Sequence, residues 1–268
     1  MTPVANARMY SATPQVRADW KALLGWTLRH AGLGWDVVDH DPPAPLNALW
    51  ARPDLGLALM CGLPFSRRES RPTLIAAPVP SPARYGGKPV YFTDIVVRAD
   101  APFRSLEDTF GGTLGYTLAD SLSGGVAWRA LLAPMKAGRT EKLYRKAVGD
   151  LIHARGVIDA LMAGRIDVGP LDSYYHDLLR HDEPALAAQV RVVARTEPMP
   201  IPPLVATART TDAELQRLRD ALGDVATSDA LAPARERLLL AGFAIPDPAG
   251  YDVLAAMARR PVPPFEDL

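Results

Sequence analysis

Cysteine is almost absent from this sequence of 268 residues. Cys61 stands alone, so the chain cannot form an internal disulfide or a cysteine-based zinc site. His176 and His181 lie five positions apart, which on a helix separates them by about 140° and leaves no shared face for a metal ion. We therefore expect neither a metal nor a cofactor.

An excess of charge of either sign is also missing. Thirty Lys and Arg residues balance thirty Asp and Glu residues, so no net field favours nucleic acid or an anionic membrane. No apolar run approaches the ~18–20 residues of a membrane span. Residues 1–8 show no basic start followed by an apolar stretch, so no secretory leader is visible. Read literally, the sequence predicts a cytoplasmic protein with no membrane span and no nucleic-acid partner.

The sequence does contain an alternation of short apolar strands and amphipathic helices. A strand is expected at 4–9. Thr13-Pro14 then supplies an N-cap hydroxyl and a proline at the first helical position. Further strands are expected at 35–38 and 55–60, the latter fully apolar. The order strand, helix, strand predicts an α/β fold with parallel pairing.

Two extended segments, near 90–98 and 194–205, enclose a second α/β block. Within this block, the capping-box-like stretch 105–108 predicts a helix start. We expect an inserted lobe that the chain enters and leaves by extended strands. The predicted organisation is a first lobe built from 1–93 and 199–268, with 94–198 forming the second lobe. Helices of the returning segment are expected at 211–225, 231–241 and 251–259.

A hydroxyl-rich turn follows the strand that begins at Leu114. Ser121, Leu122, Ser123 and Gly124 lie between this strand and a helix that starts near Val126. The first N–H groups of a helix lack intrahelical partners, and the helix dipole favours negative charge there, so the turn predicts an anion site. The alternative is that the serines only cap the helix.

Two further side chains are candidates for the same site. Asp172 ends a buried strand and opens a helix, so it either meets a ligand or caps that helix. His153 either donates to an anion or serves as a capping or surface histidine.

The order and spacing of several segments resemble one known family. These segments are Met9-Tyr10-Ser11 with Pro14, Leu55 to Pro64, Tyr91, Ser105 to Asp108, Asp120 to Gly124, His153 and Gly164 to Asp172. The pattern is similar to the phosphate, phosphite and phosphonate substrate-binding components of ABC transporters, which have the type II periplasmic-binding-protein fold.

The resemblance implies a two-lobed α/β protein with a ligand cleft between the lobes. It implies a non-catalytic, monomeric binder of a small oxyanion, located in the periplasm and partnered by an ABC permease. Residues that would contact the ligand are Ser121, Leu122, Ser123, Gly124, His153 and Asp172 in one lobe, with Tyr10, Gly62 and Tyr91 opposite.

Two other functions remain open at this stage. The same fold occurs in leaderless cytosolic enzymes similar to those of menaquinone- and thiamine-precursor synthesis, although no convincing acid–base pair or nucleophile is evident here. A cytosolic ligand sensor is the third possibility.

Overall fold

The structure is a computed structural model that describes residues 2–41 and 44–268. The chain forms two compact units. The first comprises Met1–Val90 and Pro200–Asp252, and the second comprises Tyr91–Met199 and Val253–Leu268. The second unit therefore includes the last segment of the chain, which the sequence pattern placed in the first lobe.

A six-stranded sheet forms the centre of the first unit, in the order β13-β4-β12-β3-β1-β2. β1 pairs in parallel with β2 and β3, whereas β12 is antiparallel to β3 and β4. The sequence pattern missed β4. The strands are β1 (Val4–Asn6), β2 (Asp36–Val37), β3 (Leu55–Leu59), β4 (Thr73–Pro80), β12 (Leu204–Ala206) and β13 (Leu240–Ala244).

Local capping signals place two of this unit's helices where the sequence predicts them. Thr13 accepts a 3.1 Å hydrogen bond from the N–H of Val16 and starts α1, and Thr211 forms a reciprocal capping box with Glu214 at the start of α8. The helices are α1 (Pro14–His30), α2 (Leu46–Trp50), α3 (Gly62–Arg67), α8 (Asp212–Asp224) and α9 (Ala232–Arg237), with single 3-10 turns at Ala83–Tyr85, Asp229–Leu231 and Pro248–Tyr251.

The helix expected at 231–241 ends early. α9 stops at Arg237, and the chain turns through Leu239, which has a φ of 48°, before it enters strand β13. A non-glycine residue in this left-handed region ends helical geometry. The expectation was wrong for the last part of the segment because pairing of β13 with β4 outweighs its helical periodicity.

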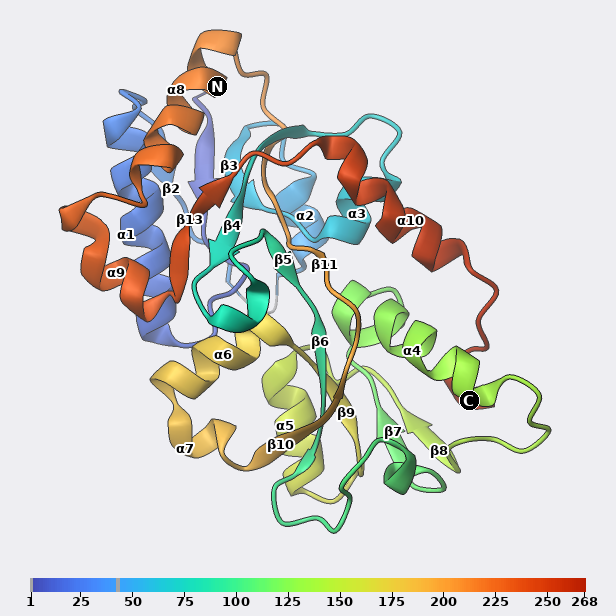
Figure 1. The fold of residues 1–268 in the computed structure, drawn as a ribbon. Coiled ribbons are helices and arrows are strands. Elements are labelled where there is room, and N and C mark those ends of the chain that lie inside the picture. The colour runs from blue at the N-terminus through green and yellow to red at the C-terminus, as the bar shows by residue number, and fades with distance from the viewer. Residues whose placement is uncertain (1, 42–43) are drawn as a thin grey trace. The chain divides into compact units, whose positions relative to one another are not determined.

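The long strand expected at 90–98 is divided in two. β5 (Val90–Tyr91) pairs with β11 (Met199–Pro200), and β6 (Thr93–Arg98) continues directly into the second unit (Figure 1). Phe92 interrupts the ladder because Ser173 takes both of its backbone groups. The N–H of Phe92 donates to the Ser173 Oγ at 3.0 Å, and its carbonyl accepts from the Ser173 N–H at 2.9 Å.

In the second unit, β6 lies between β9 and β10 and is antiparallel to both. β7 and β8 pair in parallel, and a parallel bridge joins Leu114 of β7 to Val168, just before β9. β7, β8 and β9 therefore run in the same direction. These strands are β7 (Thr113–Gly115), β8 (Lys146–Val148), β9 (Gly169–Asp172) and β10 (Val190–Arg195).

The stretch 105–108 does not start an α-helix, so that expectation was wrong. The capping bonds do form, since the Asp108 carboxylate accepts from the N–H of Ser105 at 2.9 Å and the Ser105 Oγ accepts from the N–H of Asp108 at 3.3 Å. Only one 3-10 turn follows, Glu107–Thr109, because the chain becomes extended at Phe110. The helices of this unit are α4 (Ala127–Lys136), α5 (Ala154–Met162), α6 (Ser173–Asp182) and α7 (Pro184–Ala187), together with α10 (Asp252–Arg259), which begins at the unit boundary, and a 3-10 turn at Phe265–Asp267.

The C-terminus packs into the core of the second unit. Phe265 stacks on Tyr116 with ring centroids 4.1 Å apart. The carbonyl of Leu268 accepts from the N–H of Tyr144 at 3.0 Å. These contacts explain why the last residues belong to this unit.

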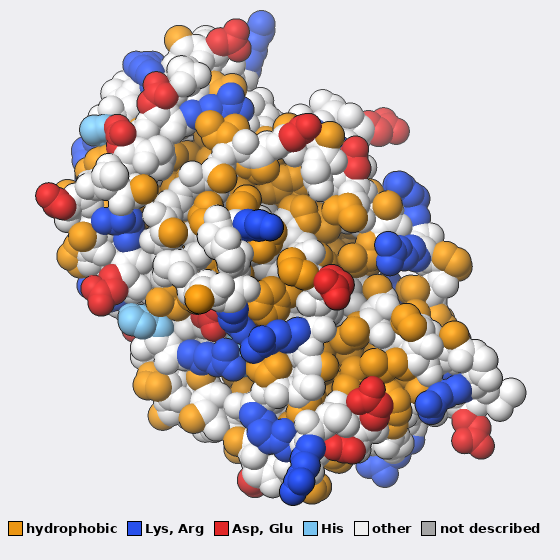
Figure 2. Space-filling view, in the orientation of Figure 1, with side chains coloured by type: hydrophobic (Ala, Val, Ile, Leu, Met, Phe, Trp, Pro, Cys, Tyr) orange, Lys and Arg blue, Asp and Glu red, His pale blue; other side chains and the backbone are white. Residues whose placement is uncertain are grey.

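None of the described helices is long and apolar enough to cross a bilayer. Basic and acidic side chains both occur across the visible face in Figure 2, in keeping with the balanced charge of the sequence.

Candidate functional site

Three candidate segments leave the second unit's strands at the same edge. Because β7, β8 and β9 run in the same direction, the turn at 121–124, His153 and Asp172 all follow carboxyl ends of strands at that edge. Ligands of α/β proteins bind at such edges. Thr93 links two of the segments, since it pairs with Asp172 and its hydroxyl donates to the carbonyl of Ser123 at 2.9 Å.

The turn after β7 has the geometry of a helix start with free donors. Ser121 is the N-cap of a π-helical turn, Leu122–Val126, which runs directly into α4. The Ser121 Oγ accepts only a long bond, 3.4 Å, from the N–H of Gly124. Within the described chain, no protein acceptor is recorded for the N–H groups of Leu122 and Ser123. Two backbone donors and two serine hydroxyls thus remain for an anion.

Close packing explains the two glycines of this turn. A Cβ at Gly124 would lie 1.7 Å from the Thr117 Oγ1, and one at Gly125 would lie 2.3 Å from the carbonyl oxygen of Leu118. The turn therefore folds directly onto the chain that leaves β7, and only glycine permits this approach.

His153 is the N-cap of α5. Its Nδ1 accepts a 3.1 Å hydrogen bond from the N–H of Gly156, which places the proton of the neutral ring on Nε2. Asp150 and Ile152 just before it have φ values of 56° and 66°. Strained backbone of this kind gathers at functional sites. The structure thus shows the capping role of His153. The Nε2–H is left as a donor, and its contact with a ligand stays a prediction.

Asp172 caps α6. Its Oδ1 accepts from the N–H groups of Tyr174 and Tyr175 at 3.0 and 3.1 Å. The capping alternative describes what this carboxylate does in the structure, and a ligand contact stays a prediction.

The candidates of the first unit lie beyond the carboxyl ends of its parallel strands. Tyr10, in the loop after β1, is buried and has a φ of 58°, which is unusual for a bulky residue. Gly62 opens α3 shortly after β3 and is also buried. Tyr91, a buried residue of β5, was expected in the first lobe with these two residues, but it begins the second unit.

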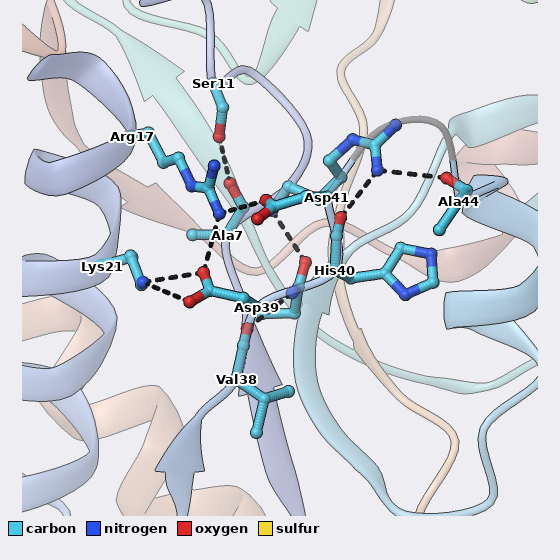
Figure 3. Close-up of polar contacts among 11 residues, drawn as sticks. Ala7, Ser11, Arg17, Lys21, Val38, Asp39, His40, Asp41 and Ala44 are labelled. Carbon is cyan, nitrogen blue, oxygen red and sulfur yellow. Dashed lines mark hydrogen bonds and ion pairs between the residues drawn. The ribbon is translucent and has the colours of Figure 1, made fainter. Parts of the chain in front are cut away.

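Beside the Tyr10 loop lies a network of charged side chains (Figure 3). Arg17 bonds to both Asp39 and Asp41, and Lys21 bonds to Asp39 at 2.8 Å. The Lys21 and Arg17 cations hold the pKa of Asp39 below its usual range. The enclosed space is only about 10 Å³, enough for about one water molecule. Since these cations are already neutralised, the network is a poor anion site.

Comparison with known proteins identifies the family. A family profile described as "ABC transporter, phosphonate, periplasmic substrate-binding protein" matches residues 50–251, more than half of the chain. The chain belongs to this family. It is the substrate-binding component of a phosphonate-type ABC transporter, as the resemblance implied.

Solved structures of similar proteins confirm the fold class, although their identities are too low to carry ligand details. A Pseudomonas aeruginosa binding protein component of an ABC phosphonate transporter has a TM-score of 0.77 at 17% identity, covering 96% of this chain and 86% of its own. PhnD1 from Prochlorococcus marinus in complex with methylphosphonate has a TM-score of 0.75 at 13% identity, and the match covers 97% of this chain and 98% of PhnD1. XAC2383 from Xanthomonas citri bound to ATP has a TM-score of 0.64 at 23% identity, and the match covers 97% of this chain and 98% of XAC2383. No curated protein sequence matches the chain.

The sequence analysis missed a buried polar group next to the candidate edge. Asp94 is 0% exposed and accepts from the Arg195 Nε at 3.2 Å, and its other oxygen lies 2.8 Å from the Nδ1 of His176. His176 is also 0% exposed, and its Nε2 has no hydrogen-bond partner. An aspartate directly before the apolar run 95–97 of a strand was the available signal. No cluster of metal-binding residues occurs in the parts of the chain that the structure describes.

Burial makes His176 a source of pH-dependent stability. Desolvation lowers its pKa below the ordinary 6.5, against a smaller opposing effect of the Asp94 hydrogen bond. The unfolded chain therefore takes up this proton first as the pH falls. We expect the contribution of His176 to the free energy of unfolding to be constant above about pH 6.5. It should decline as the pH falls from there through the pKa of His176 in the folded state. Urea titrations between pH 7.5 and 5 measure this decline.

His176→Gln, which does not titrate, is the matched variant for that series. It should give a flatter profile over the same pH range. An equal decline in both proteins would show that other groups cause it.

Proposed function

We propose that the ligand of this binding protein is a small phosphorus oxyanion, a phosphonate or phosphate, held on the turn at 121–124. The observation that carries the proposal is the pair of unpartnered N–H groups of Leu122 and Ser123 at a helix start, flanked by the hydroxyls of Ser121 and Ser123. A tetrahedral oxyanion offers several acceptors to such a set of donors.

Simple energetics support a useful affinity at this turn. Each hydrogen bond to a charged oxygen contributes about 1.5–3 kcal/mol net, and the helix dipole adds to it. Asp120, just before the turn, is exposed to solvent, so water screens the repulsion it exerts on an anion. Charge-assisted bonds from the turn therefore outweigh this one nearby carboxylate.

The other candidates complete the proposed site. The His153 Nε2–H would donate to the same anion, and Asp172 would meet an amine or hydroxyl elsewhere on the ligand. Tyr10, Gly62 and Tyr91 remain predicted contacts from the rest of the chain. The family supports the ligand class, since its profile is that of a phosphonate substrate-binding protein.

The same proposal covers the cellular role. We infer a non-catalytic, monomeric protein that acts in the periplasm and delivers its ligand to an ABC permease, as its family does. The enzyme alternative gains little from the structure, because the acid–base candidates Asp94 and His176 are fully buried and closed to a substrate.

Ser121→Ala is expected to weaken binding of methylphosphonate or phosphate roughly tenfold or more, because one charge-assisted bond is lost. Isothermal titration calorimetry measures this, after a thermal-shift screen of phosphate, phosphite, alkyl- and aminoalkylphosphonates, sulfate and organic acids has ranked the ligands. Ser105→Ala is the control, since Ser105 accepts a similarly long capping bond, 3.3 Å, from the N–H of Asp108.

Unchanged affinity in Ser121→Ala would remove the turn from the site. A response only to chorismate-like acids or thiamine precursors would instead favour the enzyme alternative.

A further inference from the structure

We propose that Thr93 is a positioning residue for the anion site, because its hydroxyl sets the orientation of the peptide group between Ser123 and Gly124. This inference rests on the proposed function. Thr93 would not touch the ligand and would act through the turn.

The geometry starts from the hydrogen bond between the Thr93 Oγ1 and the carbonyl oxygen of Ser123, 2.9 Å long. A trans peptide group is planar, so its C=O and N–H point in opposite directions. Holding the carbonyl of Ser123 therefore fixes the direction of the Gly124 N–H, which lies in the same peptide plane. In the structure this N–H makes only the long bond, 3.4 Å, to the Ser121 Oγ, and its direction sets where that hydroxyl and the neighbouring N–H groups of Leu122 and Ser123 point in the proposed site.

The neighbouring peptide groups of the turn are held in the same way, but by backbone donors. The carbonyl of Ser121 accepts from the Val126 N–H at 2.8 Å, and that of Gly124 accepts from the Thr117 N–H at 3.2 Å. The carbonyl of Leu122 accepts from the N–H that follows the π-helical turn. At Ser123 a side chain contributes, and it comes from a strand thirty positions earlier in the sequence.

Thr93 itself is firmly held. It is 0% exposed, its N–H donates to the Thr196 Oγ1 at 2.9 Å, and its carbonyl accepts from the Thr196 N–H at 3.0 Å. On the other side it pairs with Asp172 of β9. A β-branched side chain on a strand held on both sides has little rotamer freedom. Its hydroxyl is therefore preorganised, and ordering the turn costs less when the ligand binds.

The position of Thr93 gives this bond a second consequence. Thr93 opens β6 directly after the crossing segment β5, and Thr196 precedes the returning segment β11. The turn is thus hydrogen-bonded to Thr93 directly and linked through Thr93 to Thr196, so it is tied to the residues beside both crossing segments.

Thr93→Val tests the proposal, because valine keeps the shape and removes the hydroxyl. We expect it to weaken methylphosphonate binding by roughly three- to tenfold, the range of one net hydrogen bond. Thr93→Ser, which keeps the hydroxyl, should bind within about twofold of the wild type. Calorimetric titration gives the affinities, and thermal unfolding without ligand gives the stabilities.

Thr27→Val is the matched control. Thr27 of α1 is also 0% exposed, and its hydroxyl donates to the carbonyl of Leu23 at 3.0 Å. This variant should lower the melting temperature and leave the affinity unchanged, which separates lost stability from lost positioning.

The outcomes are distinct for the two proposals. Failure of the wild type to bind any phosphorus oxyanion would overturn the proposed function. Binding by the wild type, with equal affinity in Thr93→Val, would overturn the role of Thr93 alone. If Thr93→Val does not fold, Thr93→Cys replaces it, since a thiol is a weak donor of similar size. Unchanged affinity in that variant would equally overturn the role.

Discussion

Gly124→Ala is expected to abolish measurable phosphonate binding and to lower the free energy of unfolding by about 3 kcal/mol, the upper end for overpacking. The added Cβ would lie 1.7 Å from the Thr117 Oγ1 and 2.8 Å from the Thr117 Cβ. Thr117 is buried, so the turn must move away and its N–H donors lose their alignment. Urea unfolding measures the stability, and calorimetric titration measures the binding.

Gly223→Ala is the matched glycine variant. Gly223 lies in α8 with no heavy atom within 4 Å of the added Cβ, and its backbone is not left-handed. Alanine should raise stability there by about 0.5–1 kcal/mol through helix propensity, with unchanged affinity. Wild-type binding by Gly124→Ala would contradict the close packing of the turn.

Asp94→Ala is expected to destabilise the protein by up to about 3 kcal/mol, the upper end for leaving a buried polar group without its hydrogen-bond partner. The change leaves the Nδ1 of His176 buried without its partner. Arg195 loses its carboxylate as well, but its side chain is 52% exposed and can turn to water, so the buried His176 accounts for most of the loss. Chemical denaturation at pH 7.5, where His176 is neutral, measures the loss.

Asp100→Ala provides the comparison. Asp100 pairs with Arg98 at 2.5 Å, but its side chain is 69% exposed. Exposed ion pairs contribute little to stability, so the denaturation midpoint of Asp100→Ala should match that of the wild type. Equal effects of the two substitutions would show that the buried contacts of Asp94 contribute no more to stability than an exposed ion pair.

Local signals account for the parts of the fold that could be predicted from the sequence. Thr13-Pro14 and the Thr211–Glu214 box specify helix starts by hydrogen bonds within one turn, and both starts are confirmed. The similar stretch at 105–108 forms the same reciprocal capping bonds, but the chain becomes extended at Phe110 after one 3-10 turn. A local capping pattern therefore indicates where a helix can begin, but not how far it continues.

The candidate site shows the same limit more sharply. The hydroxyl-rich turn at 121–124 was visible in the sequence because its donors and glycines are consecutive. Thr93 was not, because its bond to Ser123 spans thirty positions and exists only once β6 and the turn have folded. Asp172 would use one carboxylate for both roles, and His153 can cap through Nδ1 while Nε2–H still meets a ligand, so spacing alone could not decide between the roles.

The most direct test of the central claim is a titration of ¹⁵N-labelled protein with methylphosphonate, followed through the backbone amide signals. If the turn holds the oxyanion, the amide protons of Leu122, Ser123 and Gly124 should shift strongly downfield and saturate with the calorimetric affinity. Binding at that affinity without movement of these three signals would contradict the account and place the ligand elsewhere on the protein.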